Sequence, residues 1–188
     1  MKKSGGIKIV VIGVILAALV VGYYFHLSNK TQKQQEEIAE STQVQITLMR
    51  DLEKNYPPTP KEVIKYFNEV TMCFYNEKYT DDELVQLAEK IQGIYDAELV
   101  ANKSQENYLT DLKSDIAEMK ANDRSISSYQ LPASTDVEFF SENGDSCARL
   151  YCTYSIRQGT EMMQSRLVFI LRQDENKRWK ILGWDLDD

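Results

Sequence analysis

Residues 147–172, CARLYCTYSIRQGTEMMQSRLVFILR, decide the fold class. Two runs rich in β-branched and aromatic side chains, 147–157 and 163–172, lie on either side of the turn Gln158-Gly159-Thr160. A loop this short joins antiparallel neighbours, because a parallel crossover needs about a dozen residues or more. The stretch therefore predicts an antiparallel hairpin.

Three further strands are predicted around this hairpin, at 125–131, 135–141 and 179–186. The tetrapeptide Glu142-Asn143-Gly144-Asp145 carries the strongest short hairpin signal, and Asp174-Glu175-Asn176 marks the last reversal. Because these connections are short, we expect an antiparallel meander.

A capped helix is predicted upstream of the strands. Thr59 can cap a helix that has Pro60 at its first position, and Glu62 can complete a capping box. The helix is expected to run from residue 60 to about residue 76, because four apolar side chains then share one face: Val63, Phe67, Val70 and Phe74.

More helices follow this first one. A second capping box, Thr80-Asp81-Asp82-Glu83, opens a helix that ends near Gly93. Further helices are expected at 96–101 and 104–121. Helices first and a meander afterwards predict an α+β domain over residues 59–188, with three to four helices packed on one face of a curved sheet.

The beginning of the chain carries the signal of a membrane anchor. Residues 9–25, IVVIGVILAALVVGYYF, are uninterruptedly apolar and follow Lys2, Lys3 and Lys8. At 1.5 Å per residue, residues 7–25 would span about 28 Å, close to the hydrocarbon thickness of a bilayer. We therefore expect residues 9–26 to form a single transmembrane helix.

A cleaved signal peptide is the alternative interpretation, because it also begins with basic residues. Its apolar region is usually shorter, whereas the Tyr23-Tyr24-Phe25 cluster here suits the headgroup interface. The positive-inside bias keeps residues 1–8 in the cytoplasm and places the rest of the chain outside the cell membrane. Residues 27–58, rich in Gln and Glu and ended by Pro57-Pro58, predict a helical stalk or linker.

The region beyond the anchor is acidic. The first 30 residues hold four of the 22 basic residues and none of the 29 acidic ones, so that 18 basic residues face 29 acidic residues in the rest, a net charge of −11. Affinity for nucleic acid depends on Lys and Arg displacing counterions from phosphates. No nucleic-acid partner is therefore expected.

The sequence has no catalytic or metal-binding motif. Its one histidine, His26, lies at the membrane boundary, which excludes histidine-based acid–base catalysis and His-ligated zinc from the domain. No metal ion or other cofactor is expected. Four carboxylates are the remaining acid–base candidates, and we expect them to be solvated at strand ends or on polar faces: Asp136, Glu138, Asp185 and Asp187.

Three cysteines, Cys73, Cys147 and Cys152, leave at least one thiol unpaired. Cys147 and Cys152 are five residues apart on one predicted strand, on opposite faces and about 16 Å apart, so they cannot pair with each other. Buried free thiols are the favoured expectation, and a disulfide from Cys73 to either of the others stays open.

The order of these elements resembles the nuclear transport factor 2-like (cystatin-like cone) fold over residues 59–188. The closing sequence NKRWKILGW, residues 176–184, is similar to the last strand of many such domains. The whole chain also resembles an uncharacterised family of small single-pass membrane proteins from Gram-positive bacteria, through its anchor, its stalk and the strand start RSISSY at 124–129. Both resemblances imply a fold and a location, and neither implies a catalytic residue.

A non-enzymatic, membrane-tethered interaction or scaffold module is the first functional hypothesis. Simple alternation along residues 179–186 places Trp179 and Ile181 on one face of the sheet and three apolar side chains on the other: Leu182, Trp184 and Leu186. A second apolar face needs a cover, so we expect a homodimer or a protein partner there.

Binding of a small hydrophobic ligand in the cone is the alternative hypothesis. Aromatic side chains that combine an apolar ring with a polar atom would line such a pocket: Tyr66, Tyr95, Tyr154 and Trp179. An acid–base enzyme of the same fold is the third hypothesis, since the resemblance includes ketosteroid isomerases and dehydratases.

Overall fold

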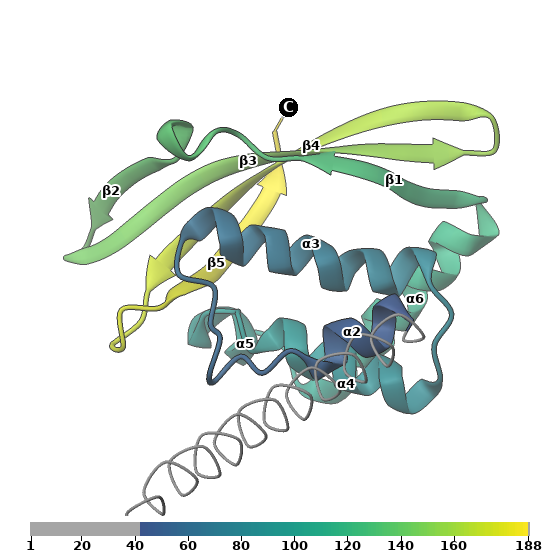
Figure 1. Cartoon of the computed structure of the whole chain (residues 1–188), viewed down its shortest axis with the longest axis horizontal. Coiled ribbons are helices and arrows are strands. Elements are labelled where there is room, and N and C mark those ends of the chain that lie inside the picture. Colours follow the sequence, from purple (N-terminus) through teal and green to yellow (C-terminus); the bar gives the residue numbers. More distant parts are fainter. Residues whose placement is uncertain (1–41, 188) are drawn as a thin grey trace, which may run out of the picture. The chain divides into compact units, whose positions relative to one another are not determined.

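Five helices precede a five-stranded sheet in residues 42–187, the part of the chain that the computed structural model describes (Figure 1). The helices are α2 (Gln43–Met49), α3 (Pro60–Asn76), α4 (Asp81–Gln92), α5 (Ala97–Ala101) and α6 (Gln105–Ala121). The strands are β1 (Arg124–Gln130), β2 (Glu138–Glu142), β3 (Asp145–Gln158), β4 (Glu161–Gln173) and β5 (Trp179–Leu186), with a 3-10 turn, η1 (Ser134–Asp136), between β1 and β2. All strand pairs are antiparallel, which confirms the predicted α+β class.

The starts of α3 and α4 follow the predicted caps. The amide of Glu62 donates a hydrogen bond to Thr59 Oγ1 at 3.2 Å. At α4 both halves of the capping box form: the Glu83 amide donates to Thr80 Oγ1 at 3.2 Å, and the Thr80 amide donates to the Glu83 carboxylate at 2.8 Å. A cap of this kind stabilises a helix by about 1 kcal/mol.

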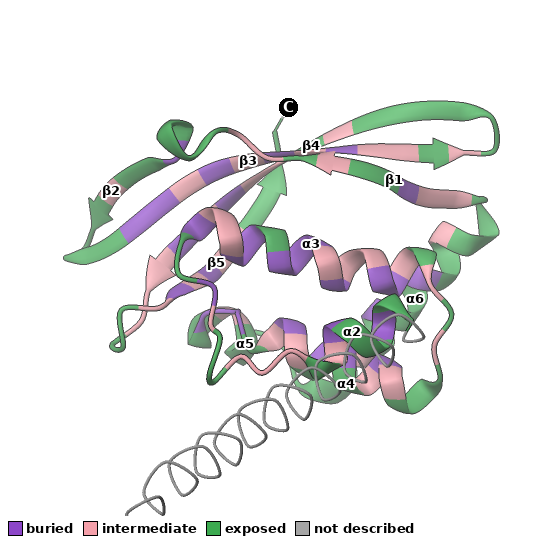
Figure 2. Ribbon diagram, viewed as in Figure 1, coloured by how far each residue is buried: buried purple, intermediate pink, exposed green. Residues whose placement is uncertain are grey.

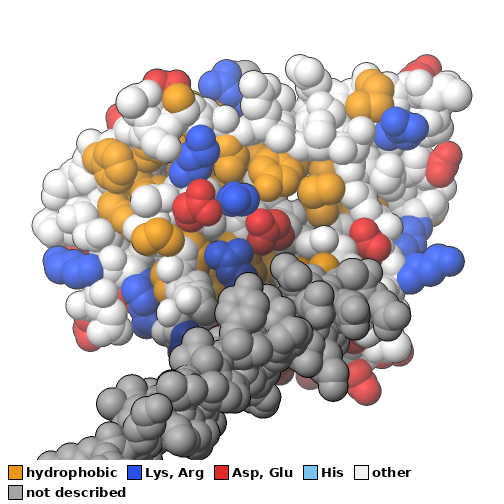
Figure 3. Space-filling model, in the orientation of Figure 1, with side chains coloured by type: hydrophobic (Ala, Val, Ile, Leu, Met, Phe, Trp, Pro, Cys, Tyr) orange, Lys and Arg blue, Asp and Glu red, His pale blue; other side chains and the backbone are white. Residues whose placement is uncertain are grey.

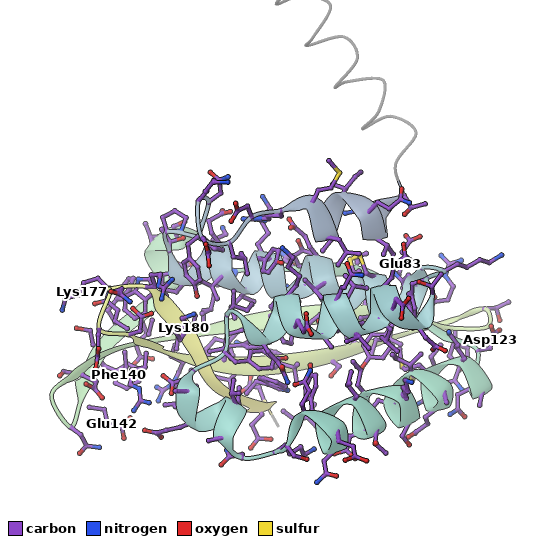
Figure 4. All side chains as sticks on the ribbon, turned by 90° about the horizontal axis from the view of Figure 1, so that it is seen from below. Glu83, Asp123, Phe140, Glu142, Lys177 and Lys180 are labelled. Atoms are coloured by element: carbon purple, nitrogen blue, oxygen red, sulfur yellow. The ribbon has the colours of Figure 1, made fainter. Side chains whose placement is uncertain are left out.

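β3 organises the sheet, whose strand order is β1-β3-β4-β5. β1 pairs with residues 153–158 of β3, and β2 pairs with residues 145–149. The two strands are therefore two parts of one edge strand that η1 interrupts. Accordingly, Asp123, just before β1, and Phe140 of β2 lie at opposite ends of the domain in Figure 4.

A β-bulge divides β5. Ile170 pairs with Gly183 and Leu171 pairs with Ile181, so that Leu182 is an extra residue opposite the β4 ladder. Because side chains alternate between the faces of a strand, one extra residue reverses the alternation beyond it.

The core lies where α3 meets the sheet, and buried residues gather there in Figure 2. The predicted apolar face of α3 is confirmed, since its side chains are at most 6% exposed: Val63, Phe67, Val70 and Phe74. The sheet contributes fully buried side chains from three strands: Leu150, Phe169, Leu171 and Ile181. α2 and α4 lie on the side of α3 that faces away from the sheet (Figures 1 and 4).

The packed unit begins at Gln43, earlier than the predicted start at Thr59. α2 buries Val44 completely. In the loop after α2, the Tyr56 hydroxyl donates a hydrogen bond to the Trp179 carbonyl at 2.7 Å. Residues 43–58, assigned to the stalk from the sequence, therefore belong to the domain. α2 has seven residues, too few for a helical period to be recognised in the sequence.

The predicted cytoplasmic residues 1–8, the predicted anchor at 9–26 and stalk residues 27–41 lie outside the described residues. Between residues 42 and 187, no helix combines the length and the apolar character that a bilayer crossing requires.

Candidate functional site

A cavity of about 530 Å³ lies between α3, the helices α4 to α6 and the helix-facing side of the sheet. Buried lining residues come from several elements: Phe67 and Phe74 from α3, Leu112 from α6, Ile126 from β1 and Tyr154 from β3. Ligand pockets commonly measure about 300–1,000 Å³. The cavity therefore has the size for a small organic molecule.

Aromatic rings form one wall of the cavity. The ring centroids of Phe67 and Trp184 are 5.3 Å apart, and those of Tyr95 and Trp184 are 5.6 Å apart. Tyr108 of α6 meets Tyr95 edge to face at 6.5 Å. Trp184 is 41% exposed, so this wall is accessible from solvent. The rings offer a ligand apolar surface whose faces also attract positive charge.

Four tyrosines are among the lining residues: Tyr75, Tyr95, Tyr108 and Tyr154. Burial raises the pKa of all four hydroxyls, that of Tyr75 to about 12. The tyrosines are therefore neutral hydrogen-bonding groups at neutral pH.

The hydroxyl of Tyr154 is hydrogen-bonded to a residue of α3. It donates a hydrogen bond to Asn68 Oδ1, and the Asn68 amide nitrogen donates to Cys152 Sγ at 3.4 Å. Asn68 is fully buried, so these partners satisfy polar atoms that have no access to water. This network fixes the ring of Tyr154 in the wall of the cavity.

Besides Trp184, the exposed lining residues mark the mouth of the cavity and come from α5, α6 and the loop between them: Val100, Asn102, Lys103, Asp111 and Asp115. Lys103 forms an ion pair with Asp111. Asp115 makes no ion pair with a basic residue in the described stretch 42–187. The mouth therefore carries two negative charges and one positive charge, and the positive charge is already paired.

Two of the four predicted pocket residues, Tyr95 and Tyr154, line the cavity. Tyr66 does not, because neighbouring residues of a helix point about 100° apart and Phe67 takes the inward position. The Tyr66 ring instead lies 4.6 Å from the Arg50 guanidinium. Trp179 lies outside the cavity as well, at the other end of β5, where its ring packs against Phe139 at 5.7 Å.

The three predicted interface residues do not share a face of the sheet. Trp184 is the cross-strand partner of Phe169, and Leu186 is the partner of Leu167, which lines the cavity. Cross-strand partners lie on the same face, so Trp184 and Leu186 return to the helix-facing side beyond the bulge at Leu182. The prediction of one outer apolar face made by these three residues is wrong.

The four candidate carboxylates lie outside the cavity. Glu138 forms an ion pair with Arg149 at 3.0 Å, and Asp187 forms one with Arg166 at 3.1 Å. The other two, Asp136 and Asp185, are exposed. The acidic groups at the mouth are different residues, both from α6.

All three cysteines, Cys73, Cys147 and Cys152, are free and buried, which confirms the favoured expectation. Burial raises the pKa of each thiol. The cysteines are therefore packed as small apolar side chains with their thiols protonated.

Sequence reasoning missed the contribution of α6. Five residues of this helix line the cavity, and four of them stand at positions i, i+4, i+7 and i+11: Tyr108, Leu112, Asp115 and Met119. Such positions lie on one face of a helix. The available signal was Asp115, an acidic residue on an otherwise apolar helix face. A carboxylate is rarely buried without a partner, so its place on an inward-facing row indicates a functional site.

The comparisons with known proteins establish a family. The profile of the family described as "Domain of unknown function (DUF6715)" matches residues 1–184. The chain belongs to this family. A search of curated proteins gives no match.

Among solved structures, the chain is similar to the helical cell shape determining protein Pgp2 (K307A mutant) from Campylobacter jejuni. The identity is 11% and the TM-score 0.36, and the match covers 68% of this chain and 41% of that chain. The DUF6715 chain thus spans less than half of that protein. A likeness this low supports no conclusion about fold or activity.

Removing one hydroxyl group from each of two buried tyrosines should have different effects on stability. Tyr154→Phe leaves Asn68 Oδ1 without its donor, and we expect the free energy of unfolding to fall by about 1–2 kcal/mol. Tyr66→Phe removes a buried hydroxyl that has no hydrogen-bond partner among the described residues, and should raise the free energy of unfolding by up to about 1 kcal/mol. Urea denaturation compares the variants, and equal losses would contradict the assigned hydrogen bonds.

Proposed function

We propose that the domain binds a small, largely apolar ligand in the cavity. The observation that carries this proposal is an open volume of about 530 Å³ lined by aromatic residues, four tyrosines among them. Protein interiors are normally packed as densely as organic crystals. An unfilled space of this size is therefore unusual in a small domain and indicates that it holds a bound molecule. We assign the cavity a binding role because apolar and aromatic side chains make up most of its lining.

The fold family and the location are further parts of the proposal. A cavity between a twisted antiparallel sheet and the helices on one of its faces supports a nuclear transport factor 2-like domain.

The apolar run at 9–25 and the lysines before it support an anchor that holds the domain outside the cell membrane. Protease treatment of intact cells that express the chain tests the location. A domain that is digested only after lysis would contradict it.

An interaction or scaffold role, with a homodimer or a protein partner, is the second candidate. It is supported by exposed apolar side chains outside the cavity, namely Phe139 at 60% and Met162 at 53% exposed. On the outer face of the sheet, however, the Arg166 guanidinium lies 4.2 Å above the Tyr151 ring and covers it. On the face seen in Figure 3, acidic and basic side chains interrupt the hydrophobic ones. The cavity therefore favours ligand binding.

A pair of serine substitutions tests ligand binding. Ser165 of β4 lines the cavity opposite Tyr154, whereas Ser155 of β3 points to the other face of the sheet. Ser165→Phe fills the cavity with a ring, and Ser155→Phe adds the same ring outside it. The full chain, kept in a non-ionic amphipol, is titrated with the neutral probe N-phenyl-1-naphthylamine.

Binding is measured as energy transfer from Trp184 to the probe. All variants carry Trp179→Phe, so that Trp184 is the one tryptophan left of the two in the chain. We expect saturable binding in this parent, unchanged binding in Ser155→Phe and binding at least about tenfold weaker in Ser165→Phe. Circular dichroism confirms that both serine variants are folded. Equal binding by the two, or no saturable transfer in the parent, would overturn the proposal.

A further inference from the structure

We propose that the cavity selects its ligand by charge and takes an apolar cation, such as an organic amine, in preference to an apolar carboxylate. This inference rests on the ligand-binding function proposed above and names the chemical class of the ligand. It follows from the charged residues at the mouth, from the aromatic rings behind the mouth and from the position of the Asp115 carboxylate.

The mouth holds no cation that a ligand carboxylate could use. Lys103 is the one basic residue among the described residues of the lining, and Asp111 already pairs with it. An incoming carboxylate would instead approach the negative charge of Asp115 and would find only neutral donors, such as the tyrosine hydroxyls, to replace its hydration. A fatty acid or another apolar acid is therefore disfavoured.

The same mouth suits a positive group. Asp115 lies on the row of α6 that faces the cavity, near the hydroxyl of Tyr75, whose pKa rises first through burial and next through the charge of Asp115. A protonated amine there would donate hydrogen bonds to the Asp115 carboxylate and to the oxygen of Tyr75. These two acceptors come from α6 and α3, which meet at the mouth.

The wall behind the mouth supports the same class of ligand. The rings of Phe67, Tyr95 and Trp184 stand in mutual contact, and the face of such a ring attracts a cation. The hydrocarbon part of an amine can pack on these rings while its charged end stays at the solvent side. The neutral tyrosine hydroxyls neither repel nor neutralise the charge.

Three probes with one carbon skeleton separate charge from shape: 4-phenylbutylamine, 4-phenylbutanol and 4-phenylbutyrate. Each competes with N-phenyl-1-naphthylamine on the full chain in the non-ionic amphipol. We expect the amine to bind about fivefold more tightly than the alcohol, because an exposed carboxylate contributes modestly, and the carboxylate probe to bind more weakly than the alcohol. Higher salt should narrow these differences.

A matched pair of variants assigns the effect to one residue. Asp115→Asn should remove the advantage of the amine, a loss of about fivefold, and leave the affinity for the alcohol unchanged. Asp136→Asn, the same change in the exposed turn η1 outside the cavity, should alter neither affinity.

The outcomes separate this inference from the proposed function. Charge selection is wrong, and ligand binding stands, if the probes bind at a site that Ser165→Phe blocks but the amine binds no more tightly than the alcohol. The same holds if Asp115→Asn keeps the higher affinity for the amine. If none of the three probes binds at a site that Ser165→Phe blocks, ligand binding in the cavity is wrong, and charge selection is wrong as well.

Discussion

Phe169→Ala is expected to lower the free energy of unfolding by about 3–5 kcal/mol. Phe169 is fully buried in the middle of β4, and its ring meets Phe67 edge-on at 5.2 Å. Truncation removes the apolar contacts of the ring and leaves a void that the rigid strand cannot close. Since small domains are stable by about 5–15 kcal/mol, this loss is a large fraction of the total.

Phe139→Ala is the matched control for this variant. Phe139 lies in β2 and is 60% exposed, so the same truncation should cost less than about 1 kcal/mol. Urea denaturation of both variants measures the difference. Similar losses would mean that the contacts of Phe169 do not form the centre of the core. Phe169→Ala should also weaken probe binding, because Phe67 and Trp184 rest on the ring that it removes.

Stability is expected to fall steeply above about pH 10, the ordinary pKa of a tyrosine. Burial raises the pKa of eight tyrosines in the described part of the chain, to about 12 for Tyr66 and Tyr75. A folded-state pKa above the unfolded one means that the stabilisation is fully present below about pH 10 and is lost as the pH rises towards about 12. Tyr66 and Tyr75 each contribute a slope of about 1.4 kcal/mol per pH unit in that window.

Ultraviolet absorbance of the phenolate and circular dichroism, followed together from neutral to alkaline pH, measure this effect. We expect most of the shifted phenols to ionise in the same transition in which the helices and strands are lost. Tyr66→Phe should move that transition to higher pH, because it removes one of the groups that ionises on unfolding. Ionisation of all phenols near about pH 10 with the circular dichroism unchanged would show that the tyrosines are not buried.

The order of the elements could be predicted because its signals are local. The reciprocal cap of Thr80 and Glu83 needs only four adjacent residues. Likewise, the turn at Asn143 and Gly144 has positive φ at both positions, 51° and 92°, as the Asn-Gly pair predicts. Signals of this kind act before any tertiary contact forms, so reading the sequence was sufficient for them.

The bulge in β5 could not be predicted, because distant residues set it. Ile181 donates a backbone hydrogen bond to the Ile94 carbonyl at 2.9 Å and accepts one from the Asp96 amide at 2.8 Å. These bonds add the segment after α4 to the edge of β5 and fix Ile181 next to the bulged residue Leu182. The face of Trp184 depends on this pairing, which no local pattern encodes.

The cavity was only partly accessible to sequence reasoning. Tyr95 and Tyr154 were candidates because aromatic residues with polar atoms are common in pockets. Lys103 and Asp115 become neighbours of the cavity only when α5 packs against β5 and α6 packs against α3 and β1. The empty volume itself is a property of how the elements fit together, and no single residue carries it.

The interruption between β1 and β2 has a consequence for association in solution. A long, continuous edge strand presents a row of unpaired backbone groups to which another chain can add a strand. Here that edge is divided into pieces of seven and five residues by η1 and by Pro132, which has no backbone N–H to donate (Figure 1). The divided edge therefore offers no long template for strand addition, so pairing of two domains through this edge is disfavoured.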